Sequence, residues 1–166
     1  MLAEGKVAAI TGFSFTSTLY AKRLGVPMED QTVLLMADYG VALYGNAIIV
    51  NTDFAKANPE AVTGFIRATA KGWKDAVAAP AEAVEALIKR NPAADPAMET
   101  DRLQMAIDAN VLTDFVKEHG MGSVEADRFA KAIEQTKSVY EFKADPDAGL
   151  YFDAQYLPTD GSLMLQ

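Results

Sequence analysis

The sequence contains no cysteine among its 166 residues. A disulfide, a thiolate metal site and a cysteine nucleophile are therefore excluded, and the redox compartment stays open. Histidine is nearly as scarce, because His119 is the single one. A histidine-rich metal centre is not expected, so any metal would have to be held by carboxylates alone. We predict neither a metal nor a cofactor.

Positive charge is also in short supply. Lysine and arginine together number 15, aspartate and glutamate number 23, and the formal net charge is -8. This balance opposes nucleic-acid binding, which depends on clustered Lys and Arg that neutralise phosphates. It also speaks against a polybasic membrane-surface module. We expect no nucleic-acid partner.

Long apolar runs are missing as well. No segment approaches the roughly 18 apolar residues needed to span a bilayer, and no basic stretch precedes an apolar one at the start. Half of the residues are nevertheless hydrophobic, which is enough for the core of one ordinary domain or two small lobes. We expect a globular protein without a membrane anchor.

The first 52 residues are punctuated by glycine and carry short apolar runs. Residues 6–10, 32–36 and 44–50 are predicted strands, the last with three β-branched residues in a row. Residues 16–24 are a predicted helix that ends at Gly25 and Pro27. This strand, helix and strand pattern predicts an α/β arrangement with too few strands to form a lobe by itself.

From residue 53 the spacing of apolar residues becomes helical. Asn58 and Pro59 predict a helix start, with an apolar stripe through Val62, Phe65, Ile66, Thr69 and Trp73. Pro80 begins a shorter helix, Asp95 and Pro96 begin one expected to run to Gly120, and Ser123 is a candidate N-cap for a further one. We predict one domain part over residues 1–52 and a second, helical one over residues 53–166.

Three segments carry a family resemblance. They are LAEGKVAAI at residues 2–10, YGNAIIV at residues 44–50, and DFAKANPEAV at residues 53–62. Together with Leu157 and Pro158 they resemble the carboxy-terminal part of solute-binding proteins of ABC importers, in the family for alkanesulfonates, taurine, nitrate and thiamine-pyrimidine precursors.

The resemblance implies a periplasmic-binding-protein-like fold of type II, present in part. Residues 1–52 would supply part of the second lobe with the return hinge strand, and residues 53–166 the helical carboxy-terminal portion of the first lobe. It also implies a small-molecule solute, a membrane permease as partner and a periplasmic location. The start at Met1 looks like the last turn of a helix, which suggests a truncated frame or a fragment.

The best candidate ligand-facing stretch is the loop at residues 11–17, where a predicted strand leads into a helix and backbone N–H groups favour a polar or anionic ligand group. The candidate contacts there are Thr11, Gly12, Phe13, Ser14, Phe15 and Thr16. Their hydroxyls can donate and accept, and a phenylalanine can form a wall against a flat ligand. The alternative is that Ser14 or Thr16 caps its own helix while Phe13 or Phe15 packs into the core.

Further candidates flank the predicted return crossing between the lobes, and they are Asp38, Tyr39, Tyr44 and Asn46. Asp38 could hold an amine and either tyrosine could stack on a ring. Asp38-Tyr39-Gly40 is equally ordinary turn chemistry.

No catalytic triad, phosphate-binding loop or dinucleotide motif is present, so we expect capture of a solute without a covalent step. The expected ligand is a sulfonate, a taurine-like molecule or a pyrimidine. One alternative is a pyrimidine-precursor synthase-like enzyme of the same fold. Another is a non-binding fragment that self-associates through bare apolar faces.

Overall fold

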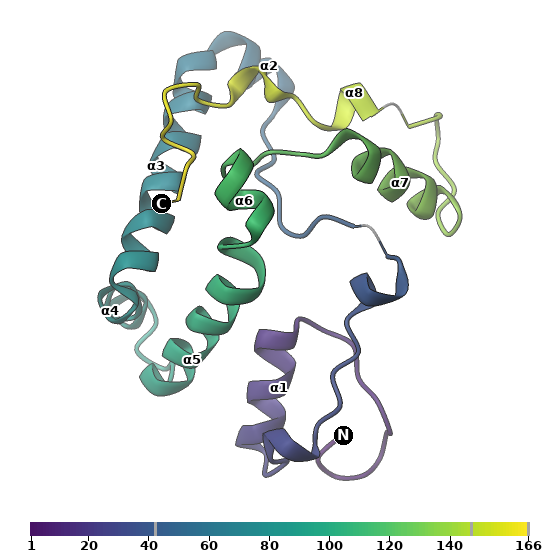
Figure 1. Ribbon diagram of the computed structural model, residues 1–166, viewed down its shortest axis with the longest axis vertical. Helices are drawn as coiled ribbons and strands as arrows, with labels where there is room; N and C mark the ends of the chain where they lie inside the picture. The colour runs from purple at the N-terminus through teal and green to yellow at the C-terminus, as the bar shows by residue number, and fades with distance from the viewer. Residues whose placement is uncertain (42, 147, 166) are drawn as a thin grey trace. The chain divides into compact units, whose positions relative to one another are not determined.

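The computed structural model of the chain describes residues 1–41, 43–146 and 148–165. Helices dominate this part of the chain (Figure 1). The α-helices are α1 (Ser14–Arg23), α2 (Thr52–Ala57), α3 (Pro59–Ala78), α4 (Pro80–Arg90), α5 (Pro96–Ala106), α6 (Asp114–His119), α7 (Ala126–Lys137) and α8 (Ala148–Tyr151). Shorter 3₁₀ turns cover Met28–Asp30, Met36–Tyr39 and Ala154–Tyr156, and a π-helical turn covers Ile107–Val111.

The predicted α/β fold is wrong for the described residues, none of which forms a strand. Residues 6–10 and 44–50 are irregular, and residues 32–36 lead into a 3₁₀ turn. Most of their apolar side chains are open to solvent, with Leu34 68% and Ile49 92% exposed. A strand is stabilised by the ladder and side chains of a neighbouring strand. Among the described residues these segments have no such neighbour, so β-branched composition alone does not produce a sheet.

The predicted helix starts are confirmed where a proline marks them. Helices α3, α4 and α5 begin at Pro59, Pro80 and Pro96. Asp95 caps α5, because its Oδ1 accepts from the backbone N–H groups of Ala97 and Met98 at 3.0 and 3.2 Å. Proline at the first helical position and an aspartate before it are local signals that need no tertiary context.

Some helix ends and buried helix faces after Pro59 differ from those that the sequence predicts. The helix predicted to run from Pro96 to Gly120 is interrupted by the π-helical turn Ile107–Val111 and resumes as α6. Ser123 does not cap the next helix: its hydroxyl donates to the carbonyl of His119 at 2.6 Å. Phe65, expected on a buried stripe, is 61% exposed.

The chain divides into two compact units. Unit 1 comprises Met1–Leu35 and Asp75–Thr113. Within it α5 packs against both α1 and α4, and α4 and α5 lie side by side in Figure 1. The buried apolar side chains of this unit are Leu19, Ala21, Val84, Ile107 and Val111.

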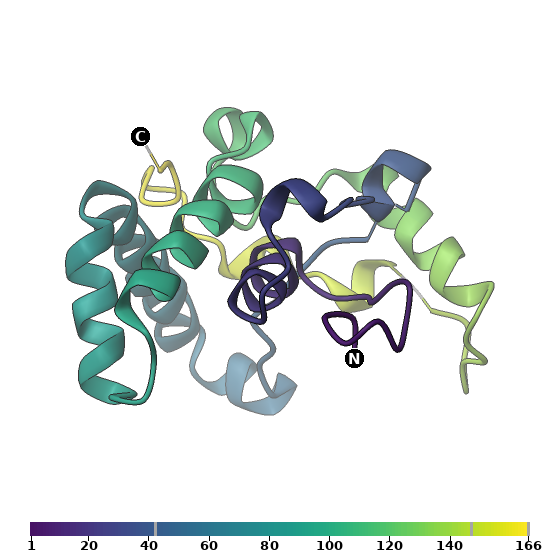
Figure 2. The same ribbon diagram turned by 90° about the horizontal axis from the view of Figure 1, so that it is seen from below.

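Unit 2 comprises Met36–Lys74 and the residues from Asp114 onward. Within it α8 lies beside α7 (Figure 2). The final segment is docked: Leu163 and Leu165 are buried, and the carbonyl of Leu163 accepts from the N–H of Met121 at 2.8 Å. Ala55, Val62, Ala70 and Ala132 complete the apolar core of this unit.

In the portion of the chain that the structure describes, none of the helices combines the length and the apolar character required to cross a bilayer.

Candidate functional site

The loop at residues 11–17 is shorter in the structure than the sequence suggested, because α1 already begins at Ser14. The N-cap position is Phe13, and no side chain caps the first turn. The carbonyl of Phe13 accepts from the N–H groups of Thr16 and Ser17 at 3.0 and 2.8 Å. An uncapped first turn leaves backbone N–H groups that an external acceptor can satisfy. The alternative reading, in which Ser14 or Thr16 caps its own helix, is therefore wrong.

Phe13 and Phe15 form an aromatic pair at this helix start. Their ring centroids are 5.3 Å apart and the ring planes differ by 18°, which is a stacked arrangement. Phe13 is 56% exposed and Phe15 is half-buried, so the pair presents one open ring to solvent. An exposed aromatic face offers stacking area to a flat ligand ring.

The polar residues of the loop surround that pair in sequence. Thr11 and Gly12 are exposed, and Ser14 and Thr16 are half-buried. A Cβ placed on Gly12 would lie 2.3 Å from the hydroxyl oxygen of Ser17. Glycine at position 12 therefore lets the Ser17 hydroxyl approach the backbone closely, as only a residue without a side chain permits.

Asp38, Tyr39 and Asn46 are exposed residues of unit 2. Asp38 and Tyr39 lie on the 3₁₀ turn Met36–Tyr39, and Gly40 follows with a φ of +87°. The structure thus contains the turn that the sequence predicts for Asp38-Tyr39-Gly40 as the alternative to ligand binding. A role for these three residues in binding a ligand stays a prediction.

Tyr44 is held by a cluster of side chains from the carboxy-terminal half of the chain. Its hydroxyl accepts from the backbone N–H of Glu125 at 2.9 Å, and the Arg128 guanidinium lies 4.4 Å from its ring centroid. The Phe129 ring is 6.2 Å from that of Tyr44, and Phe152 is 6.2 Å from Phe129. We call Tyr44, Glu125, Arg128, Phe129 and Phe152 the Tyr44 cluster.

Two more hydrogen bonds fasten the residues around Tyr44 to α7. Arg128 Nη2 donates to the carbonyl of Leu43 at 3.1 Å, and Gln135 Nε2 donates to the carbonyl of Gly40 at 2.7 Å. With one ring face covered by Arg128 and its hydroxyl oxygen accepting from the Glu125 N–H, Tyr44 is suited to anchoring this segment. Stacking on a ligand would have to use the other face of the ring.

The sequence reasoning missed Arg128, Phe129 and Phe152 as neighbours of Tyr44. Phe129 belongs to α7, the helix that the sequence predicts after Ser123. Helical spacing shows which residues share a face, but it does not show which distant segment that face contacts. No signal in a single sequence pairs residue 44 with residue 128.

Among the described residues, His119 packs against an aromatic ring and the acidic side chains form no metal-binding group. The His119 ring lies 4.5 Å from that of Phe115 at the end of α6, where Gly120 adopts a φ of +85°. In residues 1–41, 43–146 and 148–165, no three His, Asp or Glu side chains gather closely enough to hold a metal ion.

Comparison with known proteins identifies the family. Residues 1–83, half of the chain, match the family described as NMT1/THI5 like. The chain belongs to this family, and the family relationship expected from the three sequence segments is confirmed.

A curated relative gives a more particular similarity. Over 160 residues the chain is 27% identical to the riboflavin-binding protein RibY of Chloroflexus aurantiacus. The aligned region covers 93% of this chain and 44% of that protein, so the chain spans less than half the length of its relative. No solved structure matches the chain significantly.

Proposed function

We propose that the chain takes part in the binding of a small organic solute that carries a flat heteroaromatic ring. The observation that carries this proposal is the stacked Phe13–Phe15 pair, open to solvent at an uncapped helix start. Membership of the NMT1/THI5-like family supports a binding role. The similarity to a protein named as riboflavin-binding supports a ligand with a planar ring system.

In this proposal the aromatic ring and the polar groups contact different parts of the ligand. The exposed Phe13 ring stacks on the ligand ring, which favours pyrimidine or isoalloxazine ligands over taurine and alkanesulfonates. Thr11, Ser14 and the first-turn N–H groups bond the polar edge of the ligand. Binding needs no covalent step, so capture rather than catalysis is the proposed activity.

A thermal-shift screen tests the ligand class. Riboflavin, an aminopyrimidine, taurine, methanesulfonate and nitrate are each added to the purified chain. A ligand at 100 times its Kd stabilises the native state by about 2.7 kcal/mol. For a chain of this size that is a rise in Tm of roughly 5–10 °C. If neither riboflavin nor the aminopyrimidine raises the Tm, the proposed ligand class is wrong.

A variant locates the site. Phe13→Leu keeps an apolar side chain but removes the aromatic face, and we expect affinity to fall several-fold, up to about tenfold. Phe65→Leu is the matched control, because Phe65 is a similarly exposed phenylalanine in α3. Isothermal titration calorimetry should show weaker binding for Phe13→Leu alone, and an equal effect of both substitutions would place the site elsewhere.

The transport context is a further part of the proposal. We infer that the bound solute is delivered to the membrane permease of an ABC importer and that the protein works in the periplasm. The family relationship supports this inference. Deleting the gene in its host should slow uptake of the solute found in the screen, and osmotic shock should release the protein. Unchanged uptake in the deletion strain would contradict the transport role.

A specific observation also favours self-association. Both units expose large apolar side chains on irregular segments, Leu34 and Leu35 in unit 1 and Ile48 and Ile49 in unit 2. In each unit the two residues are neighbours in the sequence, and exposed apolar surface is typical of interaction sites. Size-exclusion chromatography with light scattering should detect a dimer at micromolar concentration, and a strict monomer would remove this proposal.

A further inference from the structure

A second candidate binding place lies in unit 1, apart from the loop at residues 11–17. An open hollow of about 530 Å³ is formed by α4, α5 and the start of their connection. Its volume falls within the range of small-ligand sites, roughly 300–1,000 Å³. The lining residues are Ala83, Ala86, Leu87, Arg90, Asn91, Glu99 and Arg102.

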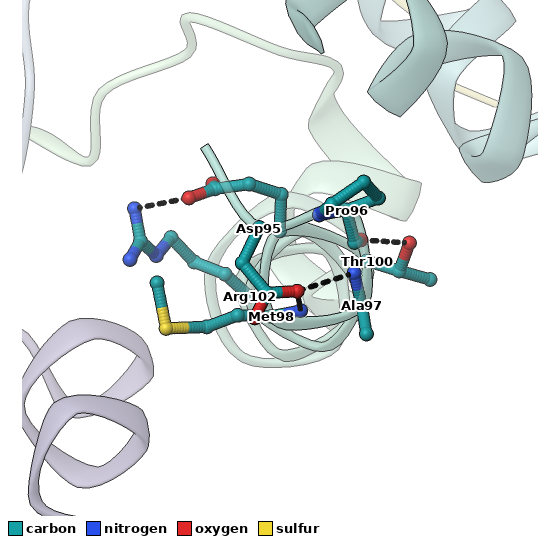
Figure 3. Close-up of polar contacts among 7 residues, drawn as sticks. Asp95, Pro96, Ala97, Met98, Thr100 and Arg102 are labelled. Carbon is teal, nitrogen blue, oxygen red and sulfur yellow. Dashed lines mark hydrogen bonds and ion pairs between the residues drawn. The ribbon is translucent and has the colours of Figure 1, made fainter. Parts of the chain in front are cut away.

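The guanidinium of Arg102 is fixed at the edge of this hollow. Its Nη1 pairs with Glu99 Oε1 at 3.1 Å, and the two side chains are only 25% and 10% exposed. Figure 3 shows Arg102 extending from α5 with a single ionic contact among the residues drawn. The Tyr20 ring of α1 lies against the guanidinium, with its centroid 5.6 Å from Cζ.

The remaining edge of the guanidinium has no partner. Nε and Nη2 are withdrawn from solvent and meet no acceptor among the described residues. These two nitrogens make up the side-on fork of an arginine, which matches the two oxygens of a carboxylate. Buried donors without acceptors are rare and mark places where a bonding group is missing.

The charged and apolar residues that line the hollow indicate which kind of carboxylate fits. Arg90 and Arg102 outnumber Glu99, so the charged groups lining the hollow sum to one positive charge. Ala83, Ala86 and Leu87 supply an apolar wall. A small monocarboxylate with a compact apolar body satisfies both features. The two nitrogens are themselves covered by side chains, so a ligand that enters from the hollow reaches them after those side chains move.

We propose that this hollow binds a small apolar monocarboxylate, with the carboxylate bonded in a bidentate manner to Nε and Nη2 of Arg102 and the apolar body against Ala83, Ala86 and Leu87.

Benzoate is the test ligand, and benzamide, of nearly the same shape but neutral, is its control. The readout is the arginine Nε–H region of a ¹⁵N–¹H correlation spectrum, recorded during a titration. Arg102→Lys removes one of the five Nε–H signals and so assigns it. Benzoate should move that signal saturably in the wild-type chain, whereas benzamide should not.

The lysine variant also tests the fork itself. Arg102→Lys retains the positive charge and the pairing with Glu99 but lacks the side-on fork, so benzoate should bind about tenfold more weakly or worse. Arg23→Lys is the matched control, because Arg23 is an exposed arginine of α1 that does not line the hollow. Arg23→Lys should leave benzoate affinity unchanged.

Each contrary result overturns the proposal. Absence of a saturable benzoate shift in the wild-type chain, equal binding of benzamide, or unchanged benzoate affinity in Arg102→Lys would each do so. Circular dichroism of Arg102→Lys establishes that the variant is folded. If it is not, the Nε–H titration of the wild-type chain alone decides, with the Arg102 signal identified through its contacts to the Tyr20 ring.

Discussion

Arg67 Nε donates to Asp160 Oδ2 at 2.8 Å and joins α3 to the carboxy-terminal segment, 93 positions further along the chain. Both side chains are about half exposed, so the pair by itself contributes little to the free energy of unfolding. Its position is more informative than its strength. It lies beside the docked segment whose buried residues are Leu163 and Leu165.

The pKa of Asp160 is lowered from 3.8 to about 2 by the Ser162 hydroxyl, by the Ser162 backbone N–H and by Arg67. Among the described residues the Ser162 hydroxyl has no hydrogen-bond partner. We therefore assign most of the effect to the N–H, which donates to Asp160 Oδ1 at 3.0 Å. A carboxylate whose pKa is depressed in the folded state stabilises that state above its unfolded pKa and loses this effect as the pH falls.

Asp160→Asn should therefore lower stability at pH 6, and the difference from the wild type should shrink as the pH falls from about 4 to about 2. Urea unfolding followed by circular dichroism at several pH values measures this. Asp101→Asn, which removes an exposed carboxylate from α5, is the control for the loss of one negative charge. A pH-independent difference for Asp160→Asn would contradict the assignment.

Gly120 is required by both backbone conformation and contact. Its φ is +85°, and an added Cβ would lie 3.3 Å from Leu163 Cβ and 3.3 Å from Met164 Sδ. Gly120→Ala should destabilise the chain by about 1–3 kcal/mol, because alanine is strained in this conformation and crowds the docked segment.

Substitutions at two other glycines allow the effect of backbone strain to be measured apart from the effect of side-chain contact. Gly161 also has a positive φ, +79°, but an added Cβ there meets nothing within 4 Å, so Gly161→Ala should cost only the strain, about 1–2 kcal/mol. Gly64 lies inside α3 with open space around it, and Gly64→Ala should stabilise by about 0.5–1 kcal/mol. Chemical denaturation of the three variants measures the change in the free energy of unfolding for each. Equal losses for Gly120→Ala and Gly161→Ala would show that the contacts of Gly120 with the docked segment contribute nothing.

The sequence predicts those features of the fold that local chemistry determines. Asp95 and Pro96 specify a helix start because a cap and a proline act within three residues. Gly120 ends α6 for the same kind of reason. The segment at residues 44–50 has the composition of a strand, yet a strand exists only with a neighbour, and the described residues provide none.

The candidate site also contains some features that the local sequence predicts and others that depend on distant residues. The stacked Phe13 and Phe15 belong to one stretch of sequence that was singled out as ligand-facing, and the structure shows how they lie. The neighbours of Tyr44 come from residues more than 80 positions away, and nothing local encodes that pairing. The unpaired edge of Arg102 could not be foreseen either, because it depends on what the rest of unit 1 fails to supply.

Tyr44 allows its two possible roles to be separated. Tyr44→Phe removes the acceptor for the Glu125 N–H but keeps the ring beneath Arg128, so stability should fall by about 0.5–1.5 kcal/mol. Tyr44→Leu also removes the cation–π contact and the ring, and the loss should be larger by about 0.5–1 kcal/mol or more. Urea denaturation measures both changes.

If Tyr44 acts only as an anchor, solute affinity measured by calorimetry should be the same in Tyr44→Phe as in the wild-type chain. Tyr140→Phe is the control, since Tyr140 is an exposed tyrosine outside the candidate site and its substitution should change neither stability nor affinity. A fall in affinity for Tyr44→Phe without a matching fall in stability would instead make its hydroxyl a ligand contact. Because the hydroxyl oxygen already accepts from the Glu125 N–H and Arg128 covers one face of the ring, we expect the anchor.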